Sequence, residues 1–418
     1  MRKIYSRIRG TTDFYPPLSS FFYKVTQKAR KLFEIFGYKE VILPLLEEES
    51  LFRRSVGEGS DIVSKQMFKI ESQDIVLRPE GTAGVVRFYL ENGLPKKGDF
   101  WKFFYIGPMF RGERPQKGRL RQFHHIGAEA IGSDNFYLDG EIINLALSIV
   151  KETGVSSFSL EINSLGCRED KEKLSIKVKE LMKGKESMMC SNCQKRLVVN
   201  PLRIFDCKQQ ECQRIISSLD LKDEYLCQRC KQEFSNLLSL LKDLNIEYKY
   251  NPYLVRGLDY YTNTVFEIKS SQLGSQDAIG AGGRYNDLIY NLGGKKTPSV
   301  GFALGLERIL LLIEPYQEES SLKVFVAYPQ PSTFPQAYHI LNHLRKNNIA
   351  AEIDYKGKSL KAQLKYSQKL GALFTVILGE EELQQNCAIV RDMNKAVQKK
   401  VALEELVPFL KDSLSSLS

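Results

Sequence analysis

The feature that most constrains the fold is a pair of strand-like stretches that flank a strongly basic segment. WKFFYIGPMF (residues 101–110) and FHHIGAEAIG (residues 123–132) have the aromatic and β-branched bias of strands. Pro115 and Gly118 interrupt the segment between them. That segment carries five basic side chains within eleven residues, namely Arg111, Arg114, Lys117, Arg119 and Arg121. We therefore predict a long antiparallel hairpin with a mobile basic tip, although a charge run alone is more often a solvated loop.

The bulk composition is that of an ordinary soluble globular protein with a basic excess. The 418 residues are 43% hydrophobic and 26% charged, and at about 150 residues per domain this length predicts two or three domains. The net charge of +10 favours a polyanionic partner, although a plain basic enzyme also fits it. No secretory signal and no apolar run of about 18 residues are recognisable. We therefore expect no membrane span and a cytoplasmic protein whose cysteines are thiols.

The first part of the chain, residues 1–320, has the pattern of an α+β domain with an antiparallel sheet. Apolar residues at helical spacing predict helices over 19–36 and 139–152 and a third one near Thr82. Strand patterns over 67–70 and 75–77 predict a hairpin. The stretch SVGFALGLERILLLIE predicts a strand that turns into a helix at about Gly305.

Two shifts in composition divide the chain further. Residues 168–244 are rich in Lys and Cys and largely helical in pattern, which indicates an inserted subdomain. QEESSL (residues 317–322) has the composition of a polar linker. From 321 to 418 strand and helix patterns alternate, which predicts a small α/β domain with a mostly parallel sheet.

Glycine-based phosphate motifs do not fit this sequence. GGKKT (residues 293–297) lacks the spacing of a P-loop, and the glycines of AIGAGGR do not match a dinucleotide fingerprint. If the protein handles ATP, it must hold the phosphates with side chains. Arginine suits that role, because its planar fork binds two oxygens and stays charged.

Three arginines and several carboxylates are candidates for such a site. Arg111, Arg256 and Arg308 stand in or beside apolar patterns, where a charge needs an anionic partner, although each alone is as easily part of a structural salt bridge. Glu80 lies at a strand-to-helix turn, and alternation predicts that Glu129 is buried. Asp259 and Glu267 flank the pair Tyr260 and Tyr261, and together these groups are suited to enclose an amino group or a heterocycle.

Seven motifs in order carry a resemblance to a known family. They are RGTTDFYP (9–16), GYKEVILPLLE (37–47), LRPEGT (77–82), FRGERPQKGRLRQF (110–123), LVRGLDYYTNTVFE (254–267), AGGRYNDL (281–288) and VGFALGLERILLL (300–312). Together they closely resemble the histidyl-tRNA synthetases, a class II aminoacyl-tRNA synthetase family. The resemblance covers almost the whole chain, and LVRGLDYY and AGGRY are typical of the histidine-specific branch.

The resemblance implies a fold and an activity. The fold would be an α+β class II synthetase catalytic domain with a helical insertion, followed by a small α/β anticodon-binding domain. The activity would be ATP-dependent ligation of L-histidine to its cognate tRNA through a histidyl-adenylate. Catalysis of that kind is mainly positioning and charge stabilisation. The cofactors would be ATP and Mg²⁺, which is commonly bound mainly through substrate oxygens.

The resemblance also assigns roles to individual residues. Arg111 and Arg256 would be catalytic at the α-phosphate, and Arg111, Glu113 and Arg308 would bind ATP. Histidine would be bound by Glu80, Thr82, His125, Glu129, Arg256, Tyr260, Tyr261 and Tyr285. Relatives often carry glutamine where this chain has His125, which puts that contact in doubt.

The basic hairpin tip and Pro44 acquire roles in the same way. The tip would meet the tRNA acceptor end or ATP phosphates, with Gln116, Lys117 and Arg119 as the tRNA contacts and Arg114 and Arg121 beside them. Its binding should then weaken with salt. Pro44 belongs to a motif that builds the dimer interface in relatives, which implies a homodimer.

The cysteines of the insertion suggest a metal. Cys190 and Cys193, and Cys227 and Cys230, are two CxxC pairs whose spacing lets two thiolates hold a tetrahedral zinc. Thirty-three residues separate the pairs, and Cys207 and Cys212 lie between them. Either four or more of these six bind a structural Zn²⁺, with the two CxxC pairs as the first candidates, or all are free thiols. Cys167 and Cys387 are expected to be packing residues.

A second class of function fits the same resemblance. A non-catalytic, synthetase-like regulatory subunit of histidine biosynthesis would share the fold. Such relatives typically lack the C-terminal domain and have degraded ATP-site motifs. Here the three arginines and the terminal domain are present, which favours the enzyme.

Overall fold

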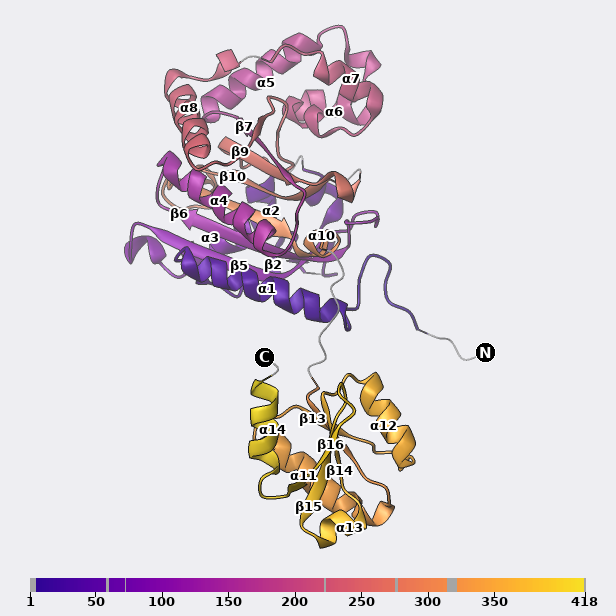
Figure 1. Cartoon of the computed structure of the whole chain (residues 1–418). Helices are drawn as coiled ribbons and strands as arrows, with labels where there is room; N and C mark the ends of the chain where they lie inside the picture. The colour runs from indigo at the N-terminus through magenta and orange to yellow at the C-terminus, as the bar shows by residue number, and fades with distance from the viewer. Residues whose placement is uncertain are drawn as a thin grey trace. The chain divides into compact units, whose positions relative to one another are not determined.

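The computed structural model describes residues 5–57, 60–71, 73–221, 223–274, 277–313 and 322–416. The chain divides into two compact units, Met1–Pro315 and Tyr316–Ser418 (Figure 1). The predicted boundary at 320/321 and nearly all of the predicted linker lie outside the described residues. Within the described ranges, no helix is long and apolar enough to cross a bilayer.

The first unit is built on an eight-stranded sheet in the order β1-β5-β6-β11-β10-β9-β7-β8. Its strands are β1 (Lys39–Glu40), β5 (Trp101–Phe110), β6 (Gln122–Ile131), β7 (Ser159–Ser164), β8 (Lys249–Tyr250), β9 (Thr262–Lys269), β10 (Ala278–Arg284) and β11 (Ser299–Gly305). The edge pairs β1–β5 and β7–β8 are parallel, and the other neighbours are antiparallel. The predicted antiparallel character of this sheet is confirmed for its centre.

The predicted hairpin is present as β5 and β6. Its register runs from Trp101 opposite Ile131 to Phe110 opposite Gln122. Beyond the strands the loop closes through a small bridge between Gln116 and Arg119, with Gly118 at φ +72° in the turn. The left-handed region favours glycine, which explains the break in the basic run at this position.

Alternation along the strands gives the sheet two different faces. Ile126, Ala128 and Ala130 of β6 pack in a core with α1 (Leu18–Ile35) and α4 (Phe136–Glu152). The intervening residues of β6, including His125 and Glu129, therefore point to the opposite face. Both helices lie where the sequence predicts them, and Figure 1 shows α4 running along the sheet.

The opposite face is flanked by smaller elements. A three-stranded sheet in the order β2-β4-β3 contains the predicted hairpin between β3 (Phe68–Lys69) and β4 (Ile75–Leu77), with β2 (Leu46–Glu48) added. The helices of this part are α2 (Glu49–Val56), α3 (Thr82–Glu91) and α9 (Leu288–Asn291). The short helix α10 (Leu306–Leu310) packs instead in the core with α1 and α4. The third predicted helix is therefore confirmed as α3, which begins at Thr82.

Four helices occupy the range of the predicted insertion. They are α5 (Arg168–Met182), α6 (Ser191–Val199), α7 (Gln210–Ser217) and α8 (Gln228–Asp243), with the 3₁₀ helix η4 (Pro201–Asp206) between α6 and α7. The first follows β7 and the last precedes β8, so both ends of the insertion meet the sheet edge. Figure 1 shows α5, α6 and α7 together beyond β7.

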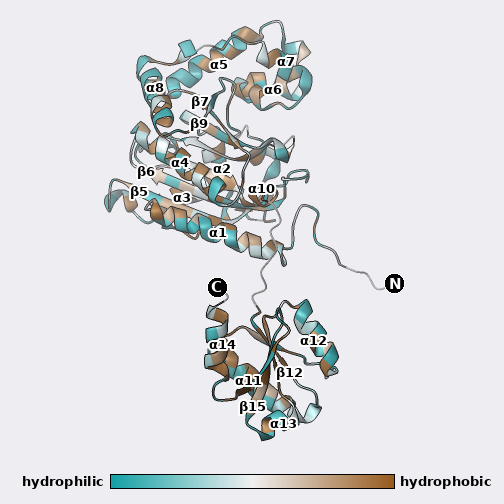
Figure 2. Ribbon diagram, viewed as in Figure 1, coloured by the Kyte–Doolittle hydropathy of each residue, from teal (hydrophilic) through white to brown (hydrophobic). Residues whose placement is uncertain are grey.

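The second unit is an α/β domain with a five-stranded sheet in the order β13-β12-β14-β15-β16. Its elements are β12 (Val324–Ala327), α11 (Phe334–Lys346), β13 (Ala351–Ile353), α12 (Leu360–Lys369), β14 (Phe374–Ile377), α13 (Glu380–Gln384), β15 (Cys387–Asp392), β16 (Gln398–Ala402) and α14 (Leu406–Ser415). Figure 2 shows hydrophobic and hydrophilic residues on each of α11, α12 and α14, as expected for helices that cover a sheet.

The prediction of a mostly parallel sheet in this unit is wrong in part. β12 pairs in parallel with β13 and β14, but β14–β15 and β15–β16 are antiparallel. The sequence pattern missed β16, whose KKVA is rich in lysine and largely exposed. Charged residues are common on edge strands, where they oppose pairing with other chains.

Candidate active site

One pocket of about 170 Å³ on the open face of the large sheet collects most of the predicted site residues. Those that line it are Glu80, Thr82, Arg111, Glu113, Arg119, His125, Arg256, Tyr260, Tyr261 and Arg308. They come from β6, α3 and the turn before it, α10, and the loops that enter β6 and β9. Motifs that are far apart in the sequence thus meet because their strands are neighbours in the sheet, as β6 and β11 are.

Glu80 lies in the floor of the pocket at the beginning of α3. Its two carboxylate oxygens accept hydrogen bonds from the backbone N–H groups of Thr82 (2.6 Å) and Ala83 (2.9 Å). A carboxylate at this position is favoured, because the first N–H groups of a helix lack intrahelical partners. Burial nevertheless raises the pKa of Glu80, since it removes water from the charged form.

Glu129 and Tyr285 lie behind the pocket wall and do not line the cavity. Glu129 accepts hydrogen bonds from the hydroxyls of Tyr285 (2.5 Å), Thr82 (2.7 Å) and Tyr105 (3.3 Å). Burial raises the pKa of Glu129 to about 8, which outweighs the stabilisation from these hydroxyls. The predicted burial of Glu129 is confirmed, and its hydroxyl partners are all neutral.

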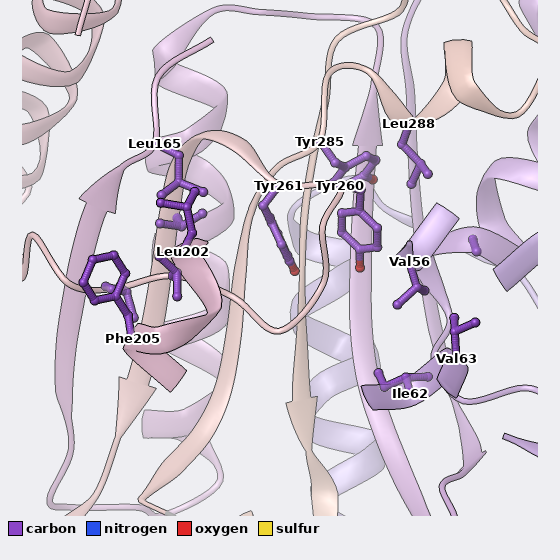
Figure 3. Close-up of a cluster of buried hydrophobic side chains, with 14 of the residues drawn as sticks. Val56, Ile62, Val63, Leu165, Leu202, Phe205, Tyr260, Tyr261, Tyr285 and Leu288 are labelled. Carbon is purple, nitrogen blue, oxygen red and sulfur yellow. The ribbon is translucent and has the colours of Figure 1, made fainter. Parts of the chain in front are cut away.

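Two adjacent tyrosines form one side of the pocket. The ring centroids of Tyr260 and Tyr261 lie 4.7 Å apart, and Tyr285 meets Tyr260 edge-on at 5.8 Å. Figure 3 shows the hydroxyls of Tyr260 and Tyr261 pointing in the same direction. Burial raises the pKa of Tyr261 to about 12, so these hydroxyls are neutral donors and acceptors near pH 7.

Arg111 is a half-buried cation without a salt bridge among the described residues. Its Nε donates to the carbonyl of Pro79 at 2.9 Å, and its guanidinium lies 5.1 Å from the centroid of the Phe123 ring. Burial lowers the pKa of Arg111, and the nearby Glu113 and Glu80 oppose that shift. The guanidinium retains donors that can bind an anion in the pocket.

Arg308 has a similar environment on the other side of the pocket. Its Nε donates to the carbonyl of Gly118 at 2.9 Å, and its Nη1 donates to the carbonyl of Ala278. Burial lowers its pKa to about 10, assisted by repulsion from Arg119 and Arg111. It is still a cation at neutral pH. Arg308, Arg119 and Arg111 are like charges around one cavity. Such an arrangement is stable only if an anion joins them or water reaches them.

Arg256 differs from these two arginines, because it is paired. Its Nη1 donates to Glu267 at 2.5 Å, and Lys269 lies 3.4 Å from the other oxygen of Glu267. Although burial lowers the pKa of Arg256, the charge of Glu267 raises it above its usual value. Its Nε is buried and has no hydrogen-bond partner within the described chain, so one donor is left for a ligand.

The two histidines of β6 have opposite environments. Nδ1 of His124 lies 2.8 Å from Glu307, and the ring packs edge-on against Phe22 at 4.9 Å. His125 lines the pocket, and its Nδ1 has no hydrogen-bond partner among the described residues. Burial and the surrounding arginines lower the pKa of His125 well below its usual value. His125 is therefore a neutral ring directed at the pocket.

The hairpin loop divides into inner and outer residues. Arg119 lines the pocket and forms an ion pair with Glu113 at 2.6 Å. Gln116 and Lys117 are exposed and do not line the cavity. The predicted tRNA residues are therefore not equivalent, since one of the three is part of the pocket wall.

Tyr105 was not among the predicted site residues, yet it lines the pocket and bonds to Glu129. A side chain at Gly81 or Gly127 would approach the Tyr105 ring to 2.3 Å. The two glycines therefore make room for this ring. Alternation in WKFFYIGPMF places Tyr105 on the same face as Phe103, which is the signal that would have found it.

Arg284 of the motif AGGRY serves the fold instead of the pocket. Its Nε donates to both oxygens of Asp139, at 2.9 and 2.8 Å, and the pair is buried. Two further bonds reach the carbonyls of Ser133 and Asn135. The charge of this arginine is therefore compensated by a buried carboxylate, and its residue does not line the pocket of Arg111 and Arg308.

The two CxxC pairs named as first candidates belong to different clusters, so their grouping in one zinc site is wrong, while zinc binding by four of the six cysteines stays a prediction. Among the described residues, one cluster consists of Cys190, Cys193, Cys207 and Cys212, and the other of Cys167, Asp170, Cys227 and Cys230. The ligand atoms within each cluster all lie within 4.8 Å of one another. The error arose because spacing along the chain does not show which CxxC pairs meet after the intervening helices fold. Cys167 is also no ordinary packing residue.

The sheet, the pocket arginines and the appended α/β unit define a class II aminoacyl-tRNA synthetase. The family model described as Histidyl-tRNA synthetase matches residues 10–309, and the model described as Anticodon binding domain matches residues 323–413. The chain belongs to the histidyl-tRNA synthetase family.

Individual relatives support this assignment over the whole length. A histidine–tRNA ligase of Halothermothrix orenii is 42% identical over 406 residues, covering 96% of this chain and 97% of that protein. One of Desulforamulus reducens is 44% identical over 413 residues, covering 97% and 99%. The crystal structure of apo histidyl-tRNA synthetase from S. aureus superposes with a TM-score of 0.80 at 33% identity, covering 98% of this chain and all of that one.

Proposed function

We propose that this chain is a histidine–tRNA ligase, which activates L-histidine with ATP and transfers it to its cognate tRNA. The observation that carries the proposal is the single pocket in which the uncompensated cations Arg111 and Arg308 face the buried carboxylate Glu80 and the tyrosine pair. A cationic half suits the phosphates of ATP, and a carboxylate half suits the ammonium group of an amino acid. Membership of the family supplies the specific amino acid.

The first chemical step is the attack of a histidine carboxylate oxygen on the α-phosphorus of ATP. The new P–O bond forms the adenylate, and the bond to the β-phosphate oxygen breaks to release pyrophosphate. Arg111 and Arg256 stabilise the charge that develops on the α-phosphate, because their guanidinium groups are fixed before the reaction. Arg308 holds the terminal phosphates. In the second step a tRNA hydroxyl attacks the histidyl carbonyl and AMP leaves.

Recognition of histidine is assigned to the carboxylate half of the pocket. Glu80 and Thr82, which line the cavity, accept the ammonium group, with Glu129 behind them bonded to the Thr82 hydroxyl. Tyr260 and Tyr261 contact the imidazole, with Tyr285 packed behind Tyr260. A substrate cation would lower the pKa of Glu129 from its value of about 8, because it favours the charged carboxylate. His125 offers a neutral nitrogen at the position between the two halves.

Mg²⁺ fits this pocket as a substrate-bound ion. The carboxylates nearest the arginines are engaged, Glu113 with Arg119 and Glu307 with His124. The phosphates would therefore supply most of its ligands, as is common for Mg²⁺. When bound, the ion supplies charge neutralisation on the β- and γ-phosphates.

The tRNA is assigned to two regions. Residues 323–413 match an anticodon-binding domain. The exposed residues Gln116 and Lys117 lie at the tip of the hairpin loop, and Arg119 of the same loop lines the pocket. We assign the acceptor end of the tRNA to this tip. The net charge of +10 favours such a polyanion. Because tRNA charging takes place where proteins are made, we assign the chain to the cytoplasm.

A homodimer is proposed from the surface around Pro44. Ile42 is 92% exposed, and Leu45 and Leu46 are 41% and 51% exposed. Phe68 and Ile70 of the neighbouring β3 region are also exposed. Several exposed apolar side chains on and beside one small sheet favour a protein–protein interface. Sedimentation analysis with an Ile42→Asp variant tests it, since a buried charge should shift the protein to monomer.

The first experiment is histidine-dependent exchange of pyrophosphate into ATP, without tRNA and against the other amino acids. We expect exchange with histidine alone, followed by histidine transfer to tRNA. Failure of exchange by a folded protein would instead favour the non-catalytic regulatory function, with His125 as the first residue to restore to glutamine.

A further inference from the structure

The insertion contains two groups of metal-binding side chains that the reaction does not use. The inner cluster is Cys190, Cys193, Cys207 and Cys212, and the root cluster is Cys167, Asp170, Cys227 and Cys230. The inner cluster lies within the insertion, and the root cluster joins the first turns of its first and last helices. We propose that each cluster binds one structural Zn²⁺ and that the two ions together hold the loop that carries Arg256, Tyr260 and Tyr261.

The inner cluster has the dimensions of a zinc site. Zinc–sulfur bonds of about 2.3 Å in a tetrahedron place the sulfurs about 3.8 Å apart. The sulfurs of Cys190 and Cys207 are 3.8 Å apart, whereas a disulfide would need about 2.05 Å. All four are free cysteines. The backbone N–H of Cys190 also donates to the sulfur of Cys212 at 3.3 Å, which favours a thiolate at that position.

The same local geometry recurs in the root cluster. Cys167, Cys190 and Cys227 each stand immediately before a helix, at its N-cap, and the partner residue follows three positions later. The first turn of a helix lets residues at these two positions point to one ligand, and its free N–H groups favour negative charge. Cys167 and Asp170 therefore form a knuckle in which a carboxylate replaces the second thiolate. Zinc accepts that ligand as well as sulfur.

Asp170 is the observation that a packing role cannot explain. Its side chain is fully buried, and neither carboxylate oxygen has a hydrogen-bond partner among the described residues. The nearest cation, Lys173 Nζ, is 3.7 Å from Oδ1, and its side chain is largely exposed. Burial makes a carboxylate costly, and the groups that oppose this cost and lower the pKa of Asp170 are the backbone N–H of Cys227 and the thiols of Cys230, Cys227 and Cys167. A divalent ion shared with three thiolates would remove that cost.

The root cluster is closely packed against Gly166 and Asn263, and an open pocket connects it to solvent. A side chain at Gly166 would come within 2.4 Å of Cβ of Asp170, so glycine is required there. Asn263 at the start of β9 donates to the sulfur of Cys230 at 3.6 Å and bonds through its backbone to Gly166 at 2.7 Å. An open pocket of about 410 Å³ is lined by Cys167, Cys227 and Cys230, which gives an ion a path from solvent.

A residue beside or within each cluster is hydrogen-bonded to the loop that carries Arg256, Tyr260 and Tyr261. Lys171, one residue after Asp170, donates to the carbonyls of Asp259 (2.7 Å) and Tyr261 (2.9 Å). Arg203 of η4, between Cys193 and Cys207, donates to the carbonyl of Gly257 (2.8 Å) and to Asp259 (3.1 Å). Each proposed ion thus fixes a helix whose cation holds the backbone between Arg256 and Tyr261. This connection rests on the proposed function, but metal binding does not.

Metal content tests the proposal without reference to activity. The full chain, expressed with added zinc and purified without chelator, should contain two zinc ions, one for each cluster. Cys193→Ser/Cys207→Ser should retain the ion of the root cluster, and Cys167→Ser/Cys227→Ser that of the inner cluster. Cys387→Ser, a buried cysteine of the other unit, is the matched control and should retain both. Binding should release thiol protons.

Co²⁺ replacement in the wild-type chain keeps the test valid if a variant fails to fold. Thiolate-to-cobalt charge transfer and tetrahedral d–d bands should saturate at two equivalents, and Asp170→Asn should alter the bands of one. Wild-type protein without zinc and without these bands would overturn the proposal. Saturation of the wild type at one equivalent, or no loss of an ion in Cys167→Ser/Cys227→Ser, would overturn the root site.

The connection to the loop is tested by kinetics. Removal of either ion should raise KM for histidine by about tenfold, a typical effect of losing outer positioning groups, with a smaller change in KM for ATP. An unchanged KM for histidine in zinc-free, folded protein would leave two structural ions and overturn their role in holding the loop. Absence of exchange in the zinc-loaded wild type would instead count against the proposed function.

Discussion

The two halves of the pocket handle buried charge in different ways. On the carboxylate side, Glu80 and Glu129 are satisfied by backbone N–H groups and hydroxyls, which are neutral. On the arginine side, Arg111 and Arg308 donate to backbone carbonyls, which are neutral as well. Arg111 and Glu80 attract one another across the pocket, but no ion pair joins Arg111 or Arg308 to a carboxylate among the described residues. The pocket therefore has a negative side at Glu80 and a positive side at Arg111 and Arg308. The first suits the ammonium group of an amino acid, and the second suits a polyphosphate.

Arg284 provides the contrast that makes this arrangement informative. Its guanidinium binds both oxygens of Asp139 and two carbonyls. Both Arg284 and Arg308 are arginines from glycine-rich motifs, and sequence alone does not separate them. The difference is the identity of the partner, since a carboxylate completes a structural pair and a carbonyl leaves the positive charge available.

The largest effect on stability is expected from breaking the compensated pair. Arg284→Ala leaves Asp139 as a buried, unpaired carboxylate and should lower the free energy of unfolding by about 3–5 kcal/mol. Urea denaturation measures the change. Exchange activity per folded molecule should stay close to wild type. A loss below about 1 kcal/mol would mean that the Arg284–Asp139 pair contributes no more to stability than a surface ion pair.

Removal of an uncompensated arginine should have the reverse signature. Arg308→Met should lower the rate of pyrophosphate exchange by about 10² to 10³-fold, the usual cost of losing one fixed charge-stabilising donor. Its stability should be unchanged or higher, because a half-buried cation without an anionic partner is removed. Arg308→Lys is the matched control for charge without the planar fork. Exchange within a few-fold of wild type in Arg308→Met would contradict the assignment.

The carboxylate half can be tested through pH. The pKa of Glu129 is about 8 in the folded chain, above its usual value near 4.5. Between these values the folded carboxyl holds a proton that the unfolded one has lost, so its contribution to stability falls as pH rises, by up to about 1.4 kcal/mol per pH unit. Glu129→Gln should remove this slope. Urea midpoints from pH 5 to 9 that run parallel for the two proteins would show that the pKa is not raised.

The smallest effect is expected at the exposed tip of the hairpin. Lys117→Ala should weaken tRNA binding by about 1 kcal/mol and reduce the slope of log affinity against log salt by about 1. Exchange without tRNA should stay near wild type. Arg119→Ala, which also removes the ion pair with Glu113, should affect exchange as well. If both variants change exchange equally, the division into inner and outer residues is wrong.

How far the sequence predicts the fold depends on the range of the interactions. The hairpin of β5 and β6 and helices α1, α3 and α4 follow from local periodicity, because hydrophobic residues repeat at the spacing of the element. Strand β16 was missed and the tail sheet misjudged, since a lysine-rich edge strand has little hydrophobic signal. Strand direction in a sheet also depends on connections that composition does not encode.

The candidate site shows the same division residue by residue. Motif order indicated Glu80, Arg111, Arg256 and Arg308, and the pocket brings these four together. Tyr105 was overlooked, because an aromatic residue in a strand is usually core. The Arg308 and Arg284 side chains look alike in sequence, and their partners come from strands and helices far along the chain.

The sequence by itself determined the family, the strongly basic hairpin and most of the predicted residues that line the pocket, because each depends on a local pattern or on the order of motifs. The tertiary structure alone decided which charges are compensated and which cysteines meet. Cys190 lies with Cys207 and Cys212, whereas Cys227 lies with Cys167, sixty residues away. Packing of the insertion helices sets these partners, since the energies of buried charges and metal ligands depend on distance in space and not on separation along the chain.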